Sequence, residues 1–258
     1  MVKASVSIVT YNNGKEIIKK LNSLISFFSD EFIQEIIIVD NNSTDDTLKK
    51  AEMFALKLSK VTIIPLTKNE GFGHGHNVAM QQSNSDYHLV MNLDVVPENP
   101  KVVSSMVKIM EDNYNIGLLS PLVKFPSGEI QLLTRNTPTV LDLAIRFLGP
   151  NILKKRQEKF VNLQTGYTQK QIIYNATGSF MFLRKKVIDQ IGGFDERFFL
   201  YMEDTDLTRT INTVSEAWFY PQFVINHEWQ RKNHSFKGSI QLMVSMIKYF
   251  NKWGWKFL

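Results

Sequence analysis

A pair of oxygen-bearing side chains ends an apolar run near the middle of the chain. Residues 87–91 read Tyr-His-Leu-Val-Met, and Asn92 and Asp94 follow before Pro97. Since residues i and i+2 of a strand point the same way, the two side chains should share one side of a strand end, with Pro97 stopping further pairing. Such oxygens, completed by substrate phosphates, suit Mg²⁺ or Mn²⁺. The pattern predicts a metal site for a phosphorylated donor, although it is also typical of a plain turn.

A second acidic cluster, between residues 195 and 206, holds five carboxyl groups among apolar residues. Its pattern predicts a helix from 205 to about 213, with Asp204 as the N-cap and Asp206 in the first turn, where the helix dipole favours a carboxylate. A carboxylate beside an apolar wall is also a good general base, because partial desolvation raises its pKa. Both hypotheses, helix start and catalytic base, stay open from the residues alone.

Histidines follow the last apolar run before the C-terminal segment. His227 comes directly after residues 223–225, which are strand-like, and Arg231 and His234 follow it. A lone histidine is usually structural, but a position after a strand with an arginine nearby also favours a metal or diphosphate contact. The residues do not choose between the two.

The elements that must position these residues alternate along the first half of the chain. The expected strands are 4–10, 35–39, 61–65 and 87–93, and the expected helices are 15–28, 46–59, 74–83 and 99–112. This alternation predicts an α/β fold with a mostly parallel open sheet and helices on both faces. The less regular second half predicts strands at 116–120, 130–133, 179–183 and 223–225, and a helix at 185–190.

Ligands of open α/β sheets bind beyond the carboxyl ends of the strands, and polar residues gather at such ends here. These residues are Thr10, Tyr11 and Asn12 after the first strand, Asp40 and Asn42 after the second, and Gly71 and Asn77 after the third. An ionised Asp40 can accept hydrogen bonds from a base N–H, and Gly71 permits close backbone approach to a ligand. Together the ends predict one ligand crevice.

Composition narrows the class of protein. The 258 residues are 43% hydrophobic and 21% charged, with a net charge of +5, and they contain no cysteine. Disulfides and thiolate metal sites are excluded, and the mild basicity fits an anionic ligand or membrane surface. No basic block with interleaved aromatic residues indicates nucleic acid. An early first strand and the lack of a long apolar run predict neither a signal peptide nor a transmembrane helix.

The C-terminal segment, residues 236–258, is predicted to be an amphipathic basic helix. One side carries apolar residues, another carries lysines, and tryptophans flank them: Met243, Met246, Ile247, Phe250, Gly254 and Phe257; Lys248, Lys252 and Lys256; Trp253 and Trp255. Such a helix suits a membrane interface, or it packs on the preceding domain with its lysines solvated.

The motifs together resemble family 2 glycosyltransferases of the GT-A fold. The matching stretches are residues 7–12, 38–43, 69–73, 92–94, 193–196 and 201–206, in this order, and the resemblance runs from residue 5 to about 235. It implies a glycosyltransferase domain at 1–235, followed by the helix at 236–258. Within the family the chain looks most like bacterial rhamnosyltransferases that build cell-surface polysaccharide.

The resemblance also implies roles for individual residues. Asp40 matches the base-binding aspartate, Asp204 the catalytic base, and Asn92 and Asp94 the D-x-D metal motif with Asn in place of the first Asp. His227 matches a position that joins metal or diphosphate binding. Other implied donor-binding residues are Thr10, Tyr11, Asn12, Asn42, Gly71 and Asn77, and implied acceptor-binding residues are Gly178, Glu203 and Asp206.

The implied reaction is transfer, with inversion, of a sugar from a nucleotide-sugar donor to a hydroxyl of a glycan or a polyprenyl-diphosphate-linked acceptor, assisted by Mg²⁺ or Mn²⁺. L-rhamnose from dTDP-rhamnose is the expected donor, and a UDP-sugar is the alternative. The expected location is cytoplasmic, peripheral on the inner face of the plasma membrane.

Two other functions are alternatives to sugar transfer. A nucleotidyltransferase would be expected to have a basic, Gly-rich end to its first strand, which residues 10–14 lack. A weakly catalytic nucleotide-sugar-binding protein is the remaining alternative, because Asn92 replaces an acid.

Overall fold

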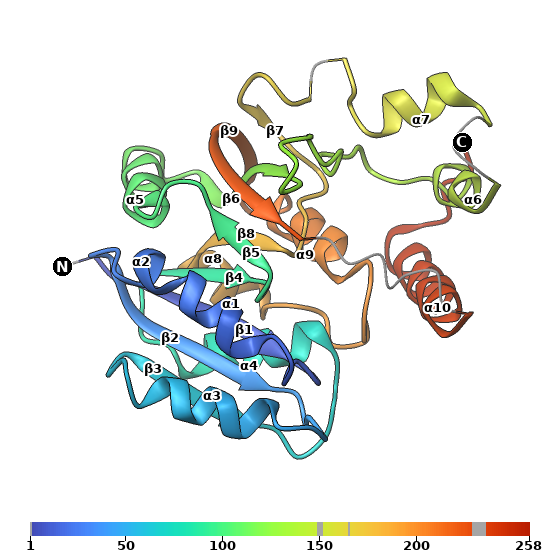
Figure 1. Ribbon diagram of the computed structural model, residues 1–258. Helices are drawn as coiled ribbons and strands as arrows, with labels where there is room; N and C mark the ends of the chain where they lie inside the picture. Colours follow the sequence, from blue (N-terminus) through green and yellow to red (C-terminus); the bar gives the residue numbers. More distant parts are fainter. Residues whose placement is uncertain (1, 149–151, 165, 229–235) are drawn as a thin grey trace.

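The computed structural model describes residues 2–148, 152–164, 166–228 and 236–258 (Figure 1). The strands are β1 (Ala4–Thr10), β2 (Ile33–Asp40), β3 (Val61–Pro65), β4 (Tyr87–Met91), β5 (Val95–Pro97), β6 (Ile116–Lys124), β7 (Gln171–Ile172), β8 (Phe180–Arg184) and β9 (Glu216–His227). The helices are α1 (Ile17–Ser23), α2 (Ile25–Phe28), α3 (Thr47–Ala55), α4 (Phe72–Gln82), α5 (Val102–Asp112), α6 (Val140–Leu148), α7 (Lys154–Phe160), α8 (Lys185–Ile191), α9 (Glu203–Ile211) and α10 (Phe236–Trp253). Arg231 and His234 lie outside the described residues.

The first half of the sheet has the predicted alternation and is parallel. Strands β3, β2, β1 and β4 lie side by side in that order, with Thr10 of β1 opposite Asp40 of β2. The run from Ile36 to Val39 is buried throughout, as expected of a parallel strand covered on both faces. The carboxyl ends of these strands therefore share one edge, as the sequence predicts.

The second half makes the sheet mixed. Among the described residues, β8 enters antiparallel between β4 and β6, and the order continues through β9 to β5. β6 and β9 are again parallel to each other, so the mixed character comes from β8, β5 and β7, which pair antiparallel with their neighbours. The β8 insertion is a long-range pairing that local sequence patterns do not reveal.

Helices cover both faces of the sheet, as predicted (Figure 1). On one face α1, α3 and α5 contribute Leu21, Phe54 and Met106 to the larger core. On the other face α8 and α9 contribute Ile188 and Leu207, with α4 packed on the same side. This two-faced burial leaves the strand ends as the place where polar side chains can meet.

Three local predictions are wrong. Residues 130–133 form no strand, because only Ile130 makes an isolated bridge to Lys124 beyond the turn closed at Gly128. Pro97 does not stop pairing: it ends β5, opposite Ile225. The helix expected at 15–28 is divided at residue 24 into α1 and α2. The strand expected at 223–225 is confirmed, as part of the longer β9.

The C-terminal helix α10 lies beside α6, away from the sheet (Figure 1). Tyr249 and Phe250 are buried with Leu143 of α6 and Phe160 of α7, and Met246 packs against them. The predicted single apolar face is therefore divided. Phe250 and Met246 pack inward, while other apolar residues stay exposed, namely Ile240, Met243, Val244 and Ile247.

The C-terminal residues after α10 also differ from the prediction. Gly254 follows the helix with φ +89°, and Phe257 beyond it is exposed. Within the described ranges, no helix is long and apolar enough to cross a membrane.

Candidate active site

A single large groove brings together six of the predicted site residues. It has a volume of about 610 Å³ and opens beside the ends of β4 and β9 and the start of α9. The predicted residues in its lining are Asn92, Asp94, Gly178, Glu203, Asp204 and His227. Chain segments more than a hundred residues apart thus form one site.

The acidic tip lies in a turn between β4 and β5, and not on a strand as predicted. The Asn92 N–H donates to the Ser179 carbonyl at 3.0 Å, which ties the turn to β8. Pairing of β5 with β9 places Val95 opposite His227, so that His227 Nε2 lies 3.4 Å from Asp94 Oδ1. Asn92 and Asp94 still line the groove. The register of the sheet orients their side chains, and not the alternation of side chains along a strand.

The environment keeps Asp94 ionised. Burial alone would raise the pKa of Asp94, but the contact with His227 and the positive charge of Lys20 hold that pKa below its ordinary value. Within the described residues, His227 Nδ1 is buried and has no hydrogen-bond partner. An anionic carboxylate, an amide oxygen and the imidazole nitrogen that faces the carboxylate, Nε2, are a donor set that fits Mn²⁺ or Mg²⁺ completed by phosphate oxygens.

Two adjacent carboxyl groups, Glu203 and Asp204, open α9. The residue before the helix is Met202, so Asp204 is not the N-cap that the sequence predicts but lies within the first turn. Asp204 Oδ2 accepts the Gly178 N–H at 2.9 Å, and its Oδ1 accepts the Thr205 N–H at 2.7 Å. These bonds orient a carboxylate whose side chain faces the groove.

Glu203 is in a different environment from its neighbour. Its side chain is buried, and Oε2 has no hydrogen-bond partner in the described part of the chain. Burial, followed by the nearby Asp204 carboxylate, raises the pKa of Glu203 well above its ordinary value. The pair thus combines a buried carboxyl group, whose neutral form is favoured, with a second carboxyl group that two backbone N–H groups orient, an arrangement suited to acid–base chemistry.

The ends of β1 and β2 form a second polar group, which lies outside the groove lining. The buried Asp40 accepts the Thr10 hydroxyl at 3.3 Å and the Ser43 N–H at 2.9 Å. Asn12 Oδ1 accepts the Thr44 N–H at 2.8 Å, which joins the two loops. Asn12 and Asn42 both have left-handed backbone, and Tyr11 is exposed beside them. The predicted donor residues are therefore adjacent to one another at this edge.

Two predicted donor residues, Gly71 and Asn77, instead hold the loop after α8. Gly71 has φ +101°, and a Cβ there would lie 2.2 Å from the Phe199 carbonyl oxygen, so only glycine fits. Asn77 Oδ1 accepts the Phe194 N–H at 2.8 Å, while its Nδ2 donates to the Phe194 carbonyl at 2.9 Å and to Glu196. With its amide engaged in this way, Asn77 holds the loop in place, and its role in donor binding stays a prediction.

Asp206 lies in the first turn of α9, as predicted, but outside the groove lining. Its buried carboxylate contacts Lys252 and Trp253 of α10. The acceptor-binding role of Asp206 stays a prediction.

Several groove residues escaped prediction. Lys20, Gln131 and Arg135 line the groove, and Gln131 Nε2 donates to the His227 carbonyl at 2.8 Å. Lys20 sits on a helix where a solvated face explains it equally well, and residues 131–135 carry no periodic pattern. No local signal distinguishes these residues. Gln131 and Arg135 reach the site only because the chain passes beside β9, and Lys20 reaches it from α1.

Known proteins share the sequence pattern. The profile described as glycosyl transferase family 2 matches residues 5–192. A Mycobacterium tuberculosis protein named N-acetylglucosaminyl-diphospho-decaprenol L-rhamnosyltransferase is 27% identical over 211 residues, which cover 77% of this chain and 67% of that protein. Rhamnosyltransferase WbbL of Escherichia coli is 26% identical over 175 residues, covering 64% of each. The chain thus spans about two thirds of the length of these relatives.

Solved structures share the fold. Mannosyltransferase PcManGT from Pyrobaculum calidifontis, described in complex with GDP-Man and Mn²⁺, has a TM-score of 0.69 at 16% identity, covering 97% of this chain and 63% of that chain. Staphylococcus aureus TarS with UDP-GlcNAc has a TM-score of 0.62 at 19% identity, covering 97% of this chain and 67% of that chain. At these identities the likeness shows the fold alone, and it confirms the predicted architecture.

Proposed function

The chain belongs to glycosyl transferase family 2 and has the GT-A fold, and on that premise we propose that it transfers a sugar, with inversion, from a nucleotide-sugar donor to a hydroxyl of a glycan or lipid-linked acceptor. The observation that carries the proposal is the shared groove, in which Asp204 stands with Asn92, Asp94 and His227. A proton acceptor and a site for a charged leaving group are the two things that such a transfer needs.

In the proposed mechanism, Asp204 takes the proton of the acceptor hydroxyl. The hydroxyl oxygen forms a bond to the anomeric carbon while the bond from that carbon to the diphosphate breaks on the opposite face, and the nucleoside diphosphate leaves with the electron pair. The N–H groups of Gly178 and Thr205 orient the Asp204 carboxylate for this step. Burial raises the pKa of Glu203 and so favours its neutral form, which adds no charge that competes for the proton.

Asp94, Asn92 and His227 are the residues that would hold a divalent cation. Mg²⁺ or Mn²⁺ bound there would offset the negative charge that develops on the leaving diphosphate. Asn92 supplies a neutral oxygen, so the protein offers one carboxylate, Asp94, at this tip. Metal binding should therefore be weaker than at a site with two carboxylates, and should strengthen when a nucleotide diphosphate is present.

The proposed donor is dTDP-L-rhamnose, and the proposed acceptor is a polyprenyl-diphosphate-linked glycan. The two relatives named as rhamnosyltransferases support this choice. A UDP-sugar is the second candidate donor, favoured by the likeness to TarS, which is described with UDP-GlcNAc.

Calorimetric titration with dTDP, UDP and GDP, each with and without Mn²⁺, tests the donor and the metal together. The proposal expects the tightest binding with dTDP and a gain on adding Mn²⁺. Transfer from dTDP-rhamnose to an N-acetylglucosaminyl-diphospho-polyprenol then tests catalysis. Preferred binding of UDP would select the second donor, and nucleotide binding without transfer would indicate a binding protein that lacks activity.

The exposed side of α10 supports a peripheral location on the cytoplasmic face of the plasma membrane, where a lipid-linked acceptor would lie. Ile240, Met243, Val244 and Ile247 form a stripe at helical spacing and are exposed. Sedimentation with anionic vesicles should pull down the intact chain, and Met243→Glu with Ile247→Glu should abolish this. Equal recovery with neutral and anionic vesicles, or none with either, would contradict the location.

A further inference from the structure

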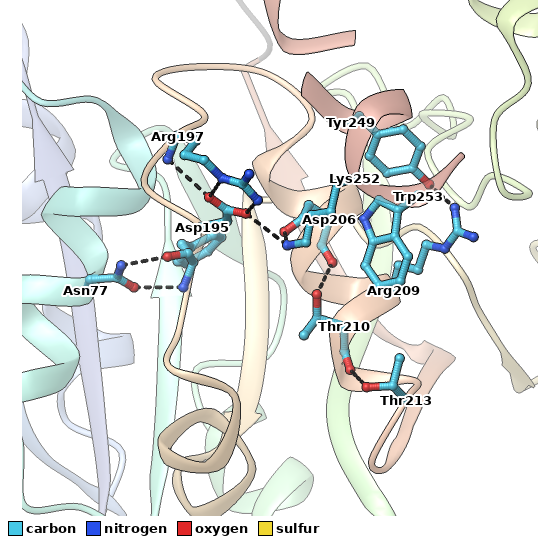
Figure 2. Close-up of polar contacts among 11 residues, drawn as sticks. Asn77, Asp195, Arg197, Asp206, Arg209, Thr210, Thr213, Tyr249, Lys252 and Trp253 are labelled. Atoms are coloured by element: carbon cyan, nitrogen blue, oxygen red, sulfur yellow. Dashed lines mark hydrogen bonds and ion pairs between the residues drawn. The ribbon is translucent and has the colours of Figure 1, made fainter. Parts of the chain in front are cut away.

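The inner face of α10 contacts the segment that carries the proposed base. Its contact residues are Ser245, Lys248, Tyr249, Lys252 and Trp253, spaced so that they fall on one side of the helix. Figure 2 shows Lys252 and Trp253 directed at Asp206 of α9. One face of a C-terminal helix thus contacts both the loop before α9 and the first turn of α9 itself.

The contact with α9 is an ion pair whose carboxylate, Asp206, is buried. Lys252 Nζ donates to Asp206 Oδ2 at 2.8 Å and to Asp195 Oδ2 at 2.9 Å, and Trp253 Nε1 donates to Asp206 Oδ1 at 2.7 Å (Figure 2). The Asp206 side chain is only 2% exposed. A carboxylate buried to this degree is stable as an anion only while its donors stay in place, so Asp206 is held to α10.

The loop before α9 is held by the same helix face. Lys248 Nζ donates to the Arg197 carbonyl at 2.5 Å, and Ser245 Oγ donates to the Leu200 carbonyl at 2.8 Å. Phe198 and Met202 are buried in one cluster with residues of α10. The loop is therefore attached to α10 at intervals along its whole length.

The contacts between this loop and α10 hold an unfavourable backbone conformation directly before α9. Tyr201 and Met202, directly before α9, have φ values of 69° and 67°. Left-handed backbone at non-glycine residues persists only where surrounding contacts enforce it. The loop would relax without those contacts, and Glu203 and Asp204 follow it immediately.

The C-terminal end of α9 also contacts α10. The Arg209 guanidinium lies 4.3 Å from the Trp253 ring centre and donates to the Tyr249 hydroxyl at 3.1 Å (Figure 2). Since Arg209 is on the last turn of α9, the two helices are joined at both ends of α9.

We propose that Lys252 and Trp253 are positioning residues for Asp204, acting through Asp206 and the loop before α9. The inference rests on the proposed function, in which Asp204 takes the acceptor proton. Asp206 lies two residues beyond Asp204 on one rigid turn, so the donors that hold Asp206 also hold the base in the groove. The segment after residue 235 is then part of the catalytic unit, not a separate extension.

Lys252→Met tests this proposal, with Lys252→Arg as the conservative variant. Lys256→Met is the matched control, because that side chain is exposed on the same C-terminal segment. Lys252→Met should lower kcat for rhamnose transfer by about 10- to 100-fold through displacement of the base, while dTDP binding changes less than about twofold. Lys252→Arg should recover most of kcat, and Lys256→Met should match the wild type.

Hydrogen exchange supplies a readout that does not depend on transfer. Amides of residues 203–207 should exchange faster in Lys252→Met than in Lys256→Met. If the wild type transfers no sugar, the proposed function fails, and hydrogen exchange still decides whether α10 holds α9. Unchanged exchange and kcat in Lys252→Met, or an equal loss of nucleotide binding and kcat, would overturn the positioning role.

Discussion

Replacing Glu203 and Asp204 one at a time by their amides should show that these adjacent carboxyl groups do different work. Glu203 is 6% exposed, and its pKa is raised by burial and by the Asp204 carboxylate. Burial therefore favours the neutral form of Glu203, and Glu203→Gln places a neutral amide of the same shape at this position. Asp204→Asn, in contrast, removes the charge that takes the proton.

The structure sets the size of each effect. An asparagine at 204 keeps one of the two acceptor bonds, from Gly178 N at 2.9 Å or Thr205 N at 2.7 Å, so the loss of stability should be about 1 kcal/mol. Loss of a general base should lower kcat by about 10²- to 10⁴-fold, or about 2.7–5.4 kcal/mol of transition-state stabilisation. Glu203→Gln should keep kcat within about threefold, because the amide resembles the neutral acid that burial favours and Asp204 remains to accept the proton.

The assay is the initial rate of nucleoside diphosphate release from dTDP-rhamnose, with a lipid-linked N-acetylglucosamine acceptor, at saturating donor. Calorimetric titration with dTDP and Mn²⁺ is the control, since neither variant alters the predicted donor residues. Both variants should bind dTDP like the wild type, so that any loss lies in kcat.

Opposite results would refute the assignment. If Glu203→Gln lost the rate and Asp204→Asn kept it, the base would be Glu203, and the raised pKa would mark a catalytic acid–base group. If both variants kept the rate, the proton acceptor would lie outside α9.

Three further predictions concern the metal, pH and backbone. Asn92→Asp should tighten Mn²⁺ binding by about tenfold, because a second carboxylate joins Asp94, and calorimetry without nucleotide would measure it; unchanged affinity would place the metal elsewhere. Between the unfolded glutamate pKa of 4.5 and the raised folded value, native Glu203 holds a proton that the unfolded chain has lost. The free energy of unfolding contributed by Glu203 should therefore fall as pH rises, by up to about 1.4 kcal/mol per pH unit, and urea denaturation of Glu203→Gln should lack this slope. Gly71→Ala should destabilise the fold by more than about 1–3 kcal/mol, because strain at φ +101° adds to a clash with Phe199; Gly128→Ala, at φ +90° in open space, should show the strain alone, and equal urea midpoints would contradict the clash.

Local patterns predicted much of the fold and part of the site. The apolar runs of β1 to β4 and the helices between them follow from periodicity, and parallel topology follows from that alternation. Asp94 and Asp204 could be singled out because each carboxyl group follows an apolar stretch, where a metal site or a general base is one of the two local interpretations. The strands, helices and acidic side chains could be predicted because they depend on interactions between residues close in sequence. The parallel topology could be predicted because alternating strands and helices follow a general rule of chain topology.

Long-range pairing decided the rest. The 3.4 Å contact of His227 with Asp94 depends on the register of β5 against β9, strands over a hundred residues apart. The irregular path of residues 131–135 past the same strand brings Gln131 and Arg135 to the groove. No periodic pattern in the sequence predicts the His227–Asp94 contact or the position of residues 131–135.

The sequence by itself determined the alternating framework, the acidic tip and the acidic cluster, because these depend on local propensity and on hydrophobic burial. The tertiary structure alone decided that Asp204 faces the groove while Asp206, two residues later, faces Lys252. It also raised the pKa of Glu203, since a pKa depends on the burial and charges around a group and not on its position in the chain. Three acids within four residues thus differ in role because each one meets a different part of the folded chain.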